Sequence, residues 1–233
     1  MKTVLTFAAA AMIATAQNPA PPPTAKKAPP GSSLDQRRGS SRVTWRTRTL
    51  AGNDRLLNWK TGPAASAFVQ GTFLEAVDKT DALGLASIEA SSRNLAPTTD
   101  VEPVKEALRP HAVALVGYRV ETITADKKLF DFAKALVAEM LIGNAALVAL
   151  AAIDALAAET KIKVALLTRN PKADLAAIAG TSRQIGLAAD TGSLNLDALA
   201  AVKDRLFALE LRRAGSLAPL FNEMNRLEIR PLF

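Results

Sequence analysis

The chain has 233 residues, of which 49% are hydrophobic and 22% are charged, and its formal net charge at pH 7 is +7. This length and composition are typical of one globular domain, with or without a terminal extension. The chain contains no cysteine, which excludes disulfide bonds, thiolate metal sites, a cysteine nucleophile and a lipid-anchor cysteine.

The positive charge is concentrated in one segment. Residues 18–60 contain nine Lys or Arg and two Asp, so this segment alone accounts for a net charge of +7. Because the remaining chain is nearly neutral, a basic groove for a phosphate backbone is not supported, and we expect no nucleic acid partner.

The first residues have the features of an export signal. Met1-Lys2 provides a short positive start, residues 3–13 are uncharged and mostly apolar, and Ala14-Thr15-Ala16 fits the small-residue rule for signal peptidase. The apolar run is shorter than the roughly 20 residues of a membrane span. We therefore predict a signal peptide over residues 1–16 and an exported protein, periplasmic or secreted, with no membrane span after cleavage. The alternative is an uncleaved apolar N-terminus.

Residues 17–58 are predicted to form a disordered basic arm. Residues 18–33 (NPAPPPTAKKAPPGSS) favour extended polyproline geometry and cannot form a core. Residues 34–58 are rich in Arg and have few apolar anchors. The arm is either a solvated tail or an attachment to an anionic partner, and the working domain is predicted over residues 59–233.

After Trp59, short β-type segments alternate with helical segments. The last helix is indicated by an apolar stripe through Leu217, Leu220, Phe221, Met224 and Leu227. In chain order we predict strand 64–69, helix 73–83, strand 85–89, helix 101–108, strand 113–118, helix 126–137, strand 139–143, helix 145–160, strand 162–167, helix 173–179, strand 185–189, helix 196–203, strand 206–211, the striped helix, and strand 229–233.

This alternation predicts an α/β fold with parallel strands joined by right-handed crossovers. Eight strands favour a small (β/α)8 TIM-type barrel, which would be incomplete because an eighth helix is missing. A doubly wound open sheet is the alternative, but no glycine-rich phosphate loop follows the first strand. The uncharged residues 140–153 are too short for a membrane span and are predicted to be a buried strand followed by a covering helix.

Three segments resemble the xylose-isomerase-like TIM-barrel family of sugar phosphate isomerases and epimerases. FLEAVDKTDALGLASIE (Phe73–Glu89) is similar to the first helix and second strand of these barrels, and KLFDFAKALVAEMLIGN (Lys128–Asn144) to their third helix and fourth strand. IGLAADTGS (Ile185–Ser193) is similar to the sixth strand and its Asp-Thr-Gly-His signature. The likeness covers residues 59–233 in the expected order.

The resemblance implies a divalent metal, such as Mn²⁺ or Mg²⁺, which polarises a sugar carbonyl and its neighbouring hydroxyl. Carried over to this sequence, the fifth-strand ligand falls on Leu167, the sixth-strand Asp is Asp190 and the His after it is Ser193. The seventh-strand His falls near Glu210, and the eighth-strand Glu would lie past Phe233. Two of the four expected ligands are lost, so Asp190 and Glu210 are the candidate metal ligands and catalytic residues.

Other polar residues at the predicted strand ends are candidates for substrate binding. Glu89, Asn144 and Arg169 could bind sugar hydroxyls or a phosphate, or could be ordinary loop residues. Tyr118 could stack on a sugar or close the top of the barrel. His111, the single histidine, precedes the third strand, at the end that serves stability in such barrels, and is predicted to be non-catalytic.

Each candidate ligand also has a structural interpretation. Asp190 could cap a turn instead of binding metal, and Glu210 could pair with Arg212 or Arg213.

Three functions remain open from the sequence. The first is an exported sugar or sugar phosphate isomerase or epimerase that moves a proton or hydride with the help of a metal. The second is a carbohydrate-binding or scaffold barrel that has lost the metal site and the chemistry. The third is a trimmed relative whose uncovered last strand favours a homo-oligomer.

Overall fold

The structure, a computed structural model, describes residues 60–68, 71–211 and 217–232. The predicted signal peptide and basic arm lie outside the described residues, so the boundaries given for them stay predictions. No helix within these ranges is long and apolar enough to cross a membrane. The hydrophobic residues 140–153 instead form a strand and the start of a helix.

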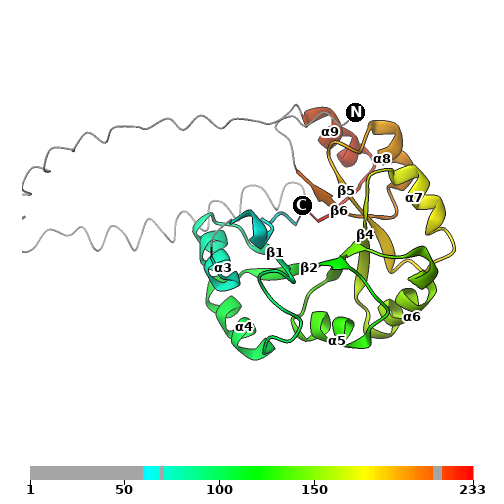
Figure 1. Ribbon diagram of the computed structural model, residues 1–233. Coiled ribbons are helices and arrows are strands. Elements are labelled where there is room, and N and C mark those ends of the chain that lie inside the picture. Colours follow the sequence, from blue (N-terminus) through cyan, green and yellow to red (C-terminus); the bar gives the residue numbers. More distant parts are fainter. Residues whose placement is uncertain (1–59, 69–70, 212–216, 233) are drawn as a thin grey trace, which may run out of the picture. The chain divides into compact units, whose positions relative to one another are not determined.

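Six parallel strands form one curved sheet, in which each strand pairs with the next strand along the chain (Figure 1). This order follows from the alternation of strands and helices, because each helix returns the chain to the edge where the next parallel strand begins. The α/β fold class and the TIM-type arrangement predicted from the sequence are confirmed. The strands are β1 (Ser87–Ser91), β2 (Ala114–Thr122), β3 (Met140–Asn144), β4 (Lys163–Thr168), β5 (Ile185–Asp190) and β6 (Leu206–Glu210).

Isolated bridges connect the two edges of this sheet. Leu232 pairs in parallel with Ala208 on β6 and with Lys60, while Ala64 pairs in parallel with Glu89 on β1. The positions of a first and an eighth barrel strand are therefore held by single bridging residues, and the ring is less regular on this side than along β1–β6.

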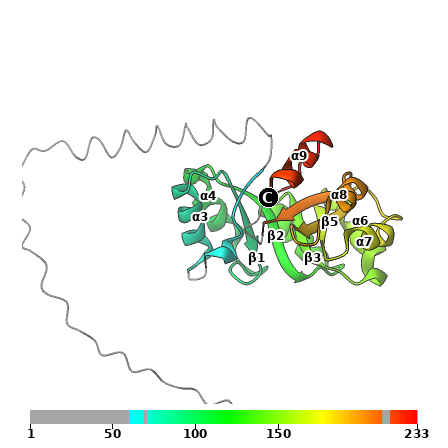
Figure 2. The same cartoon turned by 90° about the horizontal axis from the view of Figure 1, so that it is seen from above.

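The helices lie outside the ring of strands (Figures 1 and 2). Helix α3 begins with a capping box, in which the Glu75 backbone N–H donates to the Thr72 hydroxyl and the Thr72 backbone N–H donates to the Glu75 carboxylate. Side chains of Asp100, Asp126 and Asn195 accept from the first turns of three further helices. The helices are α3 (Phe73–Ala82), α4 (Val101–Leu108), α5 (Lys127–Ala135), α6 (Leu150–Thr160), α7 (Pro171–Ala177), α8 (Leu196–Val202) and α9 (Ala218–Arg226).

Neighbouring residues of one strand belong to two different hydrophobic clusters. On β3, Leu141 packs in a large cluster with helix residues such as Phe132 and Ile153, whereas Ile142 packs in a small cluster with Ala165 from β4. Side chains alternate between the two faces of a strand, so the large cluster lies between sheet and helices and the small one fills the barrel interior.

Several predicted elements have different bounds in the structure, and three of them differ in kind or by several residues. The segment predicted as the first strand contains a short 3-10 helix, η1 (Ala65–Ala67), because its Ala and Ser residues have little preference for a strand. The helix predicted over residues 145–160 begins only at Leu150, after a 3-10 turn, η3 (Leu147–Ala149). The strand predicted to end at Tyr118 continues to Thr122 as β2.

Candidate functional site

A cavity of about 630 Å³ lies between the bridging segment, β1, β2 and β6. Its wall includes apolar residues of the barrel interior, such as Val116 and Ala208. The charged residues that line it are Glu89, Arg119 and Glu210. Since Glu210 ends β6 and Arg119 lies in the carboxyl half of β2, the charges approach the barrel mouth where parallel barrels place their sites.

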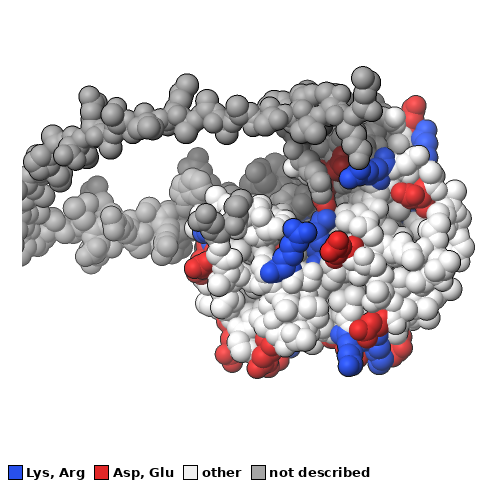
Figure 3. Space-filling model, in the orientation of Figure 1, with Lys and Arg blue, Asp and Glu red and all other residues white. Residues whose placement is uncertain are grey.

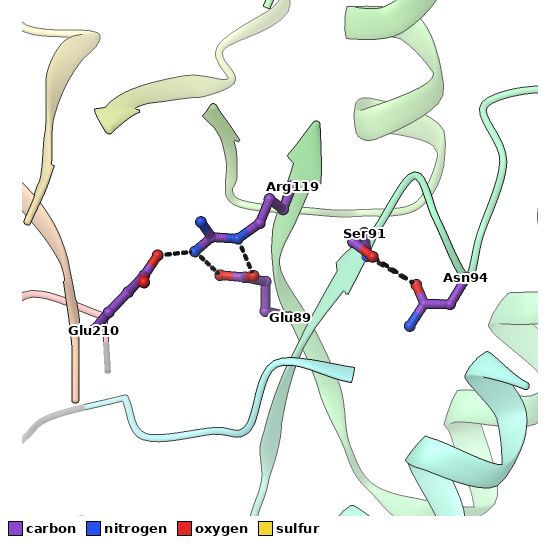
Figure 4. A network of polar contacts seen from close by, with 5 residues as sticks. All are labelled: Glu89, Ser91, Asn94, Arg119 and Glu210. Atoms are coloured by element: carbon purple, nitrogen blue, oxygen red, sulfur yellow. Dashed lines mark hydrogen bonds and ion pairs between the residues drawn. The ribbon is translucent and has the colours of Figure 1, made fainter. Parts of the chain in front are cut away.

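Arg119 lies between the two carboxylates (Figure 4). Its Nε donates to Glu89 Oε1 at 2.6 Å, and its Nη2 donates to Glu89 Oε2 at 3.1 Å. Nη2 also donates to Glu210 Oε1, across the barrel interior. The remaining nitrogen, Nη1, has no hydrogen-bond partner within the described part of the chain. It is therefore available to a ligand in the cavity.

The three charged side chains are largely withdrawn from solvent. The exposed fractions are 20% for Arg119, 12% for Glu89 and 20% for Glu210. Burial lowers the pKa of Arg119, but the hydrogen bonds and negative charges of Glu89 and Glu210 outweigh burial and raise that pKa above its ordinary value. The guanidinium is thus a permanent cation that holds two carboxylates at fixed positions.

The side chain of Arg119 turns inward because both of its neighbours pack outward. Tyr118 and Val120 are buried in the cluster between sheet and helices, which leaves the opposite face to Arg119. Gly117 provides space for the pair, because a Cβ there would lie 3.4 Å from Glu89 Cγ and 2.9 Å from Ile142 Cδ1.

Tyr118 lies outside the cavity. Its side chain is fully buried, its hydroxyl donates to the Leu95 carbonyl at 2.7 Å, and its ring meets Phe132 edge to face with centroids 5.3 Å apart. Burial raises the pKa of Tyr118. This placement gives Tyr118 a structural role in holding the loop after β1, rather than the role of stacking on a sugar.

The same loop is ordered by a side-chain turn next to the network (Figure 4). Asn94 Oδ1 accepts from the Ser91 backbone N–H at 3.0 Å and from the Ser91 hydroxyl at 3.2 Å. The Ser92 backbone N–H donates to the Arg119 carbonyl. These hydrogen bonds order the loop after β1 and join it to the backbone of Arg119 on β2.

Asp190 ends β5 and caps the turn that follows. Its Oδ1 accepts from the Gly192 backbone N–H at 2.7 Å and from the Ser193 backbone N–H at 2.8 Å. Asp190 pairs in register with Glu210, so the two predicted ligands are neighbours on adjacent strands. Asp190 does not line the cavity, however, and Glu210 is bonded to Arg119.

The other candidates lie apart from the network. Asn144 is exposed at the end of β3 and donates to the Glu121 carbonyl, and Arg169 is exposed after β4. His111 precedes β2 and contacts carboxylates of α3, with Nδ1 3.0 Å from Asp81 Oδ2 and Nε2 3.2 Å from the Asp78 carboxylate. Of the predicted site residues, the structure brings together Glu89 and Glu210 and separates them from Tyr118, Asn144 and Arg169.

The two predicted metal ligands at this mouth are already hydrogen-bonded to the protein. Within residues 60–68, 71–211 and 217–232, no group of three or more His, Cys, Asp or Glu side chains could hold a metal ion. Asp190 offers one carboxylate oxygen already engaged by two N–H groups, and Glu210 neutralises a guanidinium. A divalent metal at this mouth stays a prediction.

Sequence reasoning missed Arg119, the residue at the centre of the site. Arg119 follows directly after Tyr118, the predicted end of the third strand. The signal was a charge within the apolar stretch Val116–Val120. Inside a barrel strand, such a charge must either reach the mouth or find opposite charges in the interior.

The arrangement of charges is also visible at the surface. Figure 3 shows acidic and basic side chains in small mixed groups on the face seen in Figure 1, separated by wide uncharged areas. On this face the described residues show no continuous field of one sign, which agrees with the near neutrality of the chain after residue 60.

Comparison with family models and with curated proteins finds no match, whereas solved structures share the fold. A putative uncharacterised protein from Parabacteroides distasonis superposes with a TM-score of 0.65 at 20% identity, over 75% of this chain and 88% of that chain. A xylose isomerase domain protein from Planctomyces limnophilus has a TM-score of 0.57 at 13% identity, over 75% and 87%.

A xylose isomerase domain-containing protein from Salmonella typhimurium LT2 has a TM-score of 0.54 at 8% identity, over 74% of this chain and 86% of that chain. At these identities the likeness concerns the fold alone. The shared fold agrees with the family that the three sequence segments resemble.

Proposed function

We propose that this chain, which has the fold of the xylose isomerase-like TIM barrels, binds a neutral carbohydrate in the cavity beside Glu89, Arg119 and Glu210. The observation that carries the proposal is the ion-pair network at the cavity wall. It presents carboxylate oxygens that accept hydrogen bonds and one guanidinium nitrogen that donates. Neighbouring hydroxyls of a sugar can donate to the former and accept from the latter.

The charge of the cavity favours a neutral sugar over a sugar phosphate. The described lining residues include two carboxylates and one cation, so these residues together carry an excess of one negative charge. A phosphate group would meet this charge in a partly buried setting, where electrostatic repulsion is stronger than in water. Apolar lining from Val116, Ala208 and Leu232 suits the C–H face of a sugar ring.

The proposal is a binding function without metal-assisted catalysis. The side chains predicted to hold a metal each have another partner: Asp190 caps a turn and Glu210 pairs with Arg119. An exported binding protein would meet free sugars outside the cytoplasm, which is consistent with the signal peptide predicted from the sequence.

The test is calorimetric titration of the full chain in the presence of a chelator. Neutral pentoses and hexoses are compared with their phosphate esters. We expect at least one neutral sugar to bind and its phosphate ester to bind at least tenfold more weakly. Glu210→Gln should weaken sugar binding at least tenfold, because the carboxylate becomes an amide while the Arg119–Glu89 pair is kept.

Glu159→Gln is the matched control. Glu159 is an exposed carboxylate on α6 that pairs with Lys127, and it is not among the residues that line the cavity. This variant should leave sugar binding unchanged. Failure of every neutral sugar to bind, or equal effects of the two Gln variants, would overturn the proposal.

A metal-dependent isomerase or epimerase is the second candidate, because Asp190 and Glu210 are neighbours in register on β5 and β6. Aldose–ketose conversion is assayed with added Mn²⁺ and with chelator. Turnover that requires Mn²⁺ and disappears in Asp190→Asn would establish this candidate in place of a purely binding role. Unchanged turnover in that variant would reject a metal-binding role for Asp190.

A further inference from the structure

The opposite end of the barrel contains a second cavity, of about 400 Å³. Its lining residues come from the amino ends of the strands: Ser87 begins β1, Met140 begins β3 and Lys163 begins β4. Lys60 and Arg230 belong to the segments that bridge the sheet edges. The two cavities share Leu232, which lies in the interior cluster.

The charged residues of this N-terminal mouth are predominantly basic. Lys60, Lys163 and Arg230 line it together with one carboxylate, Glu139. Lys60 pairs with that carboxylate. Two positive charges therefore remain without a carboxylate partner among the described residues.

Both remaining cations are held at the mouth by the protein itself. The ammonium of Lys163 lies over the Phe207 ring, 5.2 Å from its centroid, an arrangement that stabilises a cation. Arg230 uses Nη1 to donate to the Ile229 carbonyl at 2.9 Å, which leaves its other guanidinium nitrogens for an external acceptor. Ser87, which is buried and lines the same cavity, adds a hydroxyl.

We propose that this N-terminal mouth binds a small multivalent oxyanion, a phosphate group or a polycarboxylate, through Lys163 and Arg230. Residues with two cations and a hydroxyl line one cavity large enough for such an ion, and a guanidinium and an ammonium are the donors that oxyanions prefer. The site is separate from the carbohydrate cavity and opposite to it in charge. Its function does not depend on sugar binding.

The experiment is calorimetric titration of the full chain with inorganic phosphate and, in a parallel arm, with citrate, at constant ionic strength. The variant Lys163→Gln/Arg230→Gln should bind at least tenfold more weakly than the wild type. The control variant Lys172→Gln/Arg93→Gln removes the same two residue types from exposed positions outside the cavity and should bind within twofold of the wild type. Both variants keep the basic N-terminal segment, so anions bound there contribute equally.

A charge-conserving variant, Lys163→Arg/Arg230→Lys, keeps the proposal testable if the Gln variant fails to fold. It should retain phosphate or citrate binding within a few-fold of the wild type. Binding of only one of the two anions identifies the ligand chemistry. Equal losses in the site and control variants, or no loss in either, would overturn the proposal, and Glu210→Gln separates it from the sugar site because it should leave anion binding unchanged.

Discussion

Arg119 on β2 binds both carboxylate oxygens of Glu89 on β1, with donor–acceptor distances of 2.6 and 3.1 Å. This bidentate pairing fixes the plane of the guanidinium. Its Nη2 thereby also reaches Glu210, which is 91 residues away in the sequence. One cation thus connects three strands around the cavity, and its removal should affect both stability and ligand binding.

Replacing Arg119 with Met should destabilise the protein by about 3 kcal/mol, because two largely buried carboxylates lose the cation that neutralises them. Urea unfolding followed by circular dichroism measures the effect. The triple variant Arg119→Met/Glu89→Gln/Glu210→Gln removes the charges together and should recover most of the lost stability. An Arg119→Met protein as stable as the wild type would show that the network contributes little.

Tyr118→Phe should reduce stability by about 1–2 kcal/mol, because the buried Leu95 carbonyl loses the hydroxyl that donates to it. The edge-to-face contact with Phe132 is retained in this variant. Sugar affinity should change by less than twofold, since Tyr118 faces the helices. A selective loss of sugar affinity without loss of stability would show that Tyr118 takes part in sugar binding.

Asp190→Ala should cost about 1 kcal/mol of stability, since the backbone N–H groups of Gly192 and Ser193 lose their acceptor. Asp190→Asn keeps an acceptor oxygen and should remain close to the wild type. Thermal unfolding of the two variants compares them directly. If both are equally destabilised, the charge of Asp190, rather than its capping oxygen, is what the structure needs.

Val137→Gly should stabilise the protein by about 1 kcal/mol. Val137 has a φ of 61° after α5, in the left-handed region that branched side chains rarely adopt. Its side chain is 70% exposed, so little packing is lost on its removal. Chemical unfolding measures the gain, and Val137→Ala, which keeps a Cβ at the same φ, should recover less of it.

Much of the architecture was predictable because local patterns carry it. Helix α4 matches the predicted range 101–108, and the Asp100 side chain caps its first turn. The predicted strands near residues 139–143, 162–167 and 185–189 lie within one residue of β3, β4 and β5. These strands are apolar on both faces, since helices cover one side and the barrel interior the other.

The predicted bounds of secondary-structure elements were wrong where the local pattern was ambiguous. The alanine- and serine-rich start of the described chain was predicted as a strand, yet it forms η1 and contributes only single bridges. Leu147 and Val148 continued the apolar pattern of a helix but lie exposed in the turn before α6. A hydrophobic residue in a connecting turn carries no sequence signal that separates it from a core residue.

The sequence by itself determined the order of parallel strands and helices, because hydrophobic periodicity and helix caps act over a few neighbouring residues. It also identified Glu89 and Glu210 as polar residues at strand ends. Only the tertiary structure decided that Arg119 joins these two carboxylates, that Asp190 caps its own turn, and that basic residues gather at the opposite mouth. Curvature of the sheet produces the contacts between strands, since it brings side chains from distant strands together across the barrel interior, whereas the Asp190 cap is a local contact that the sequence left open against a metal-binding role.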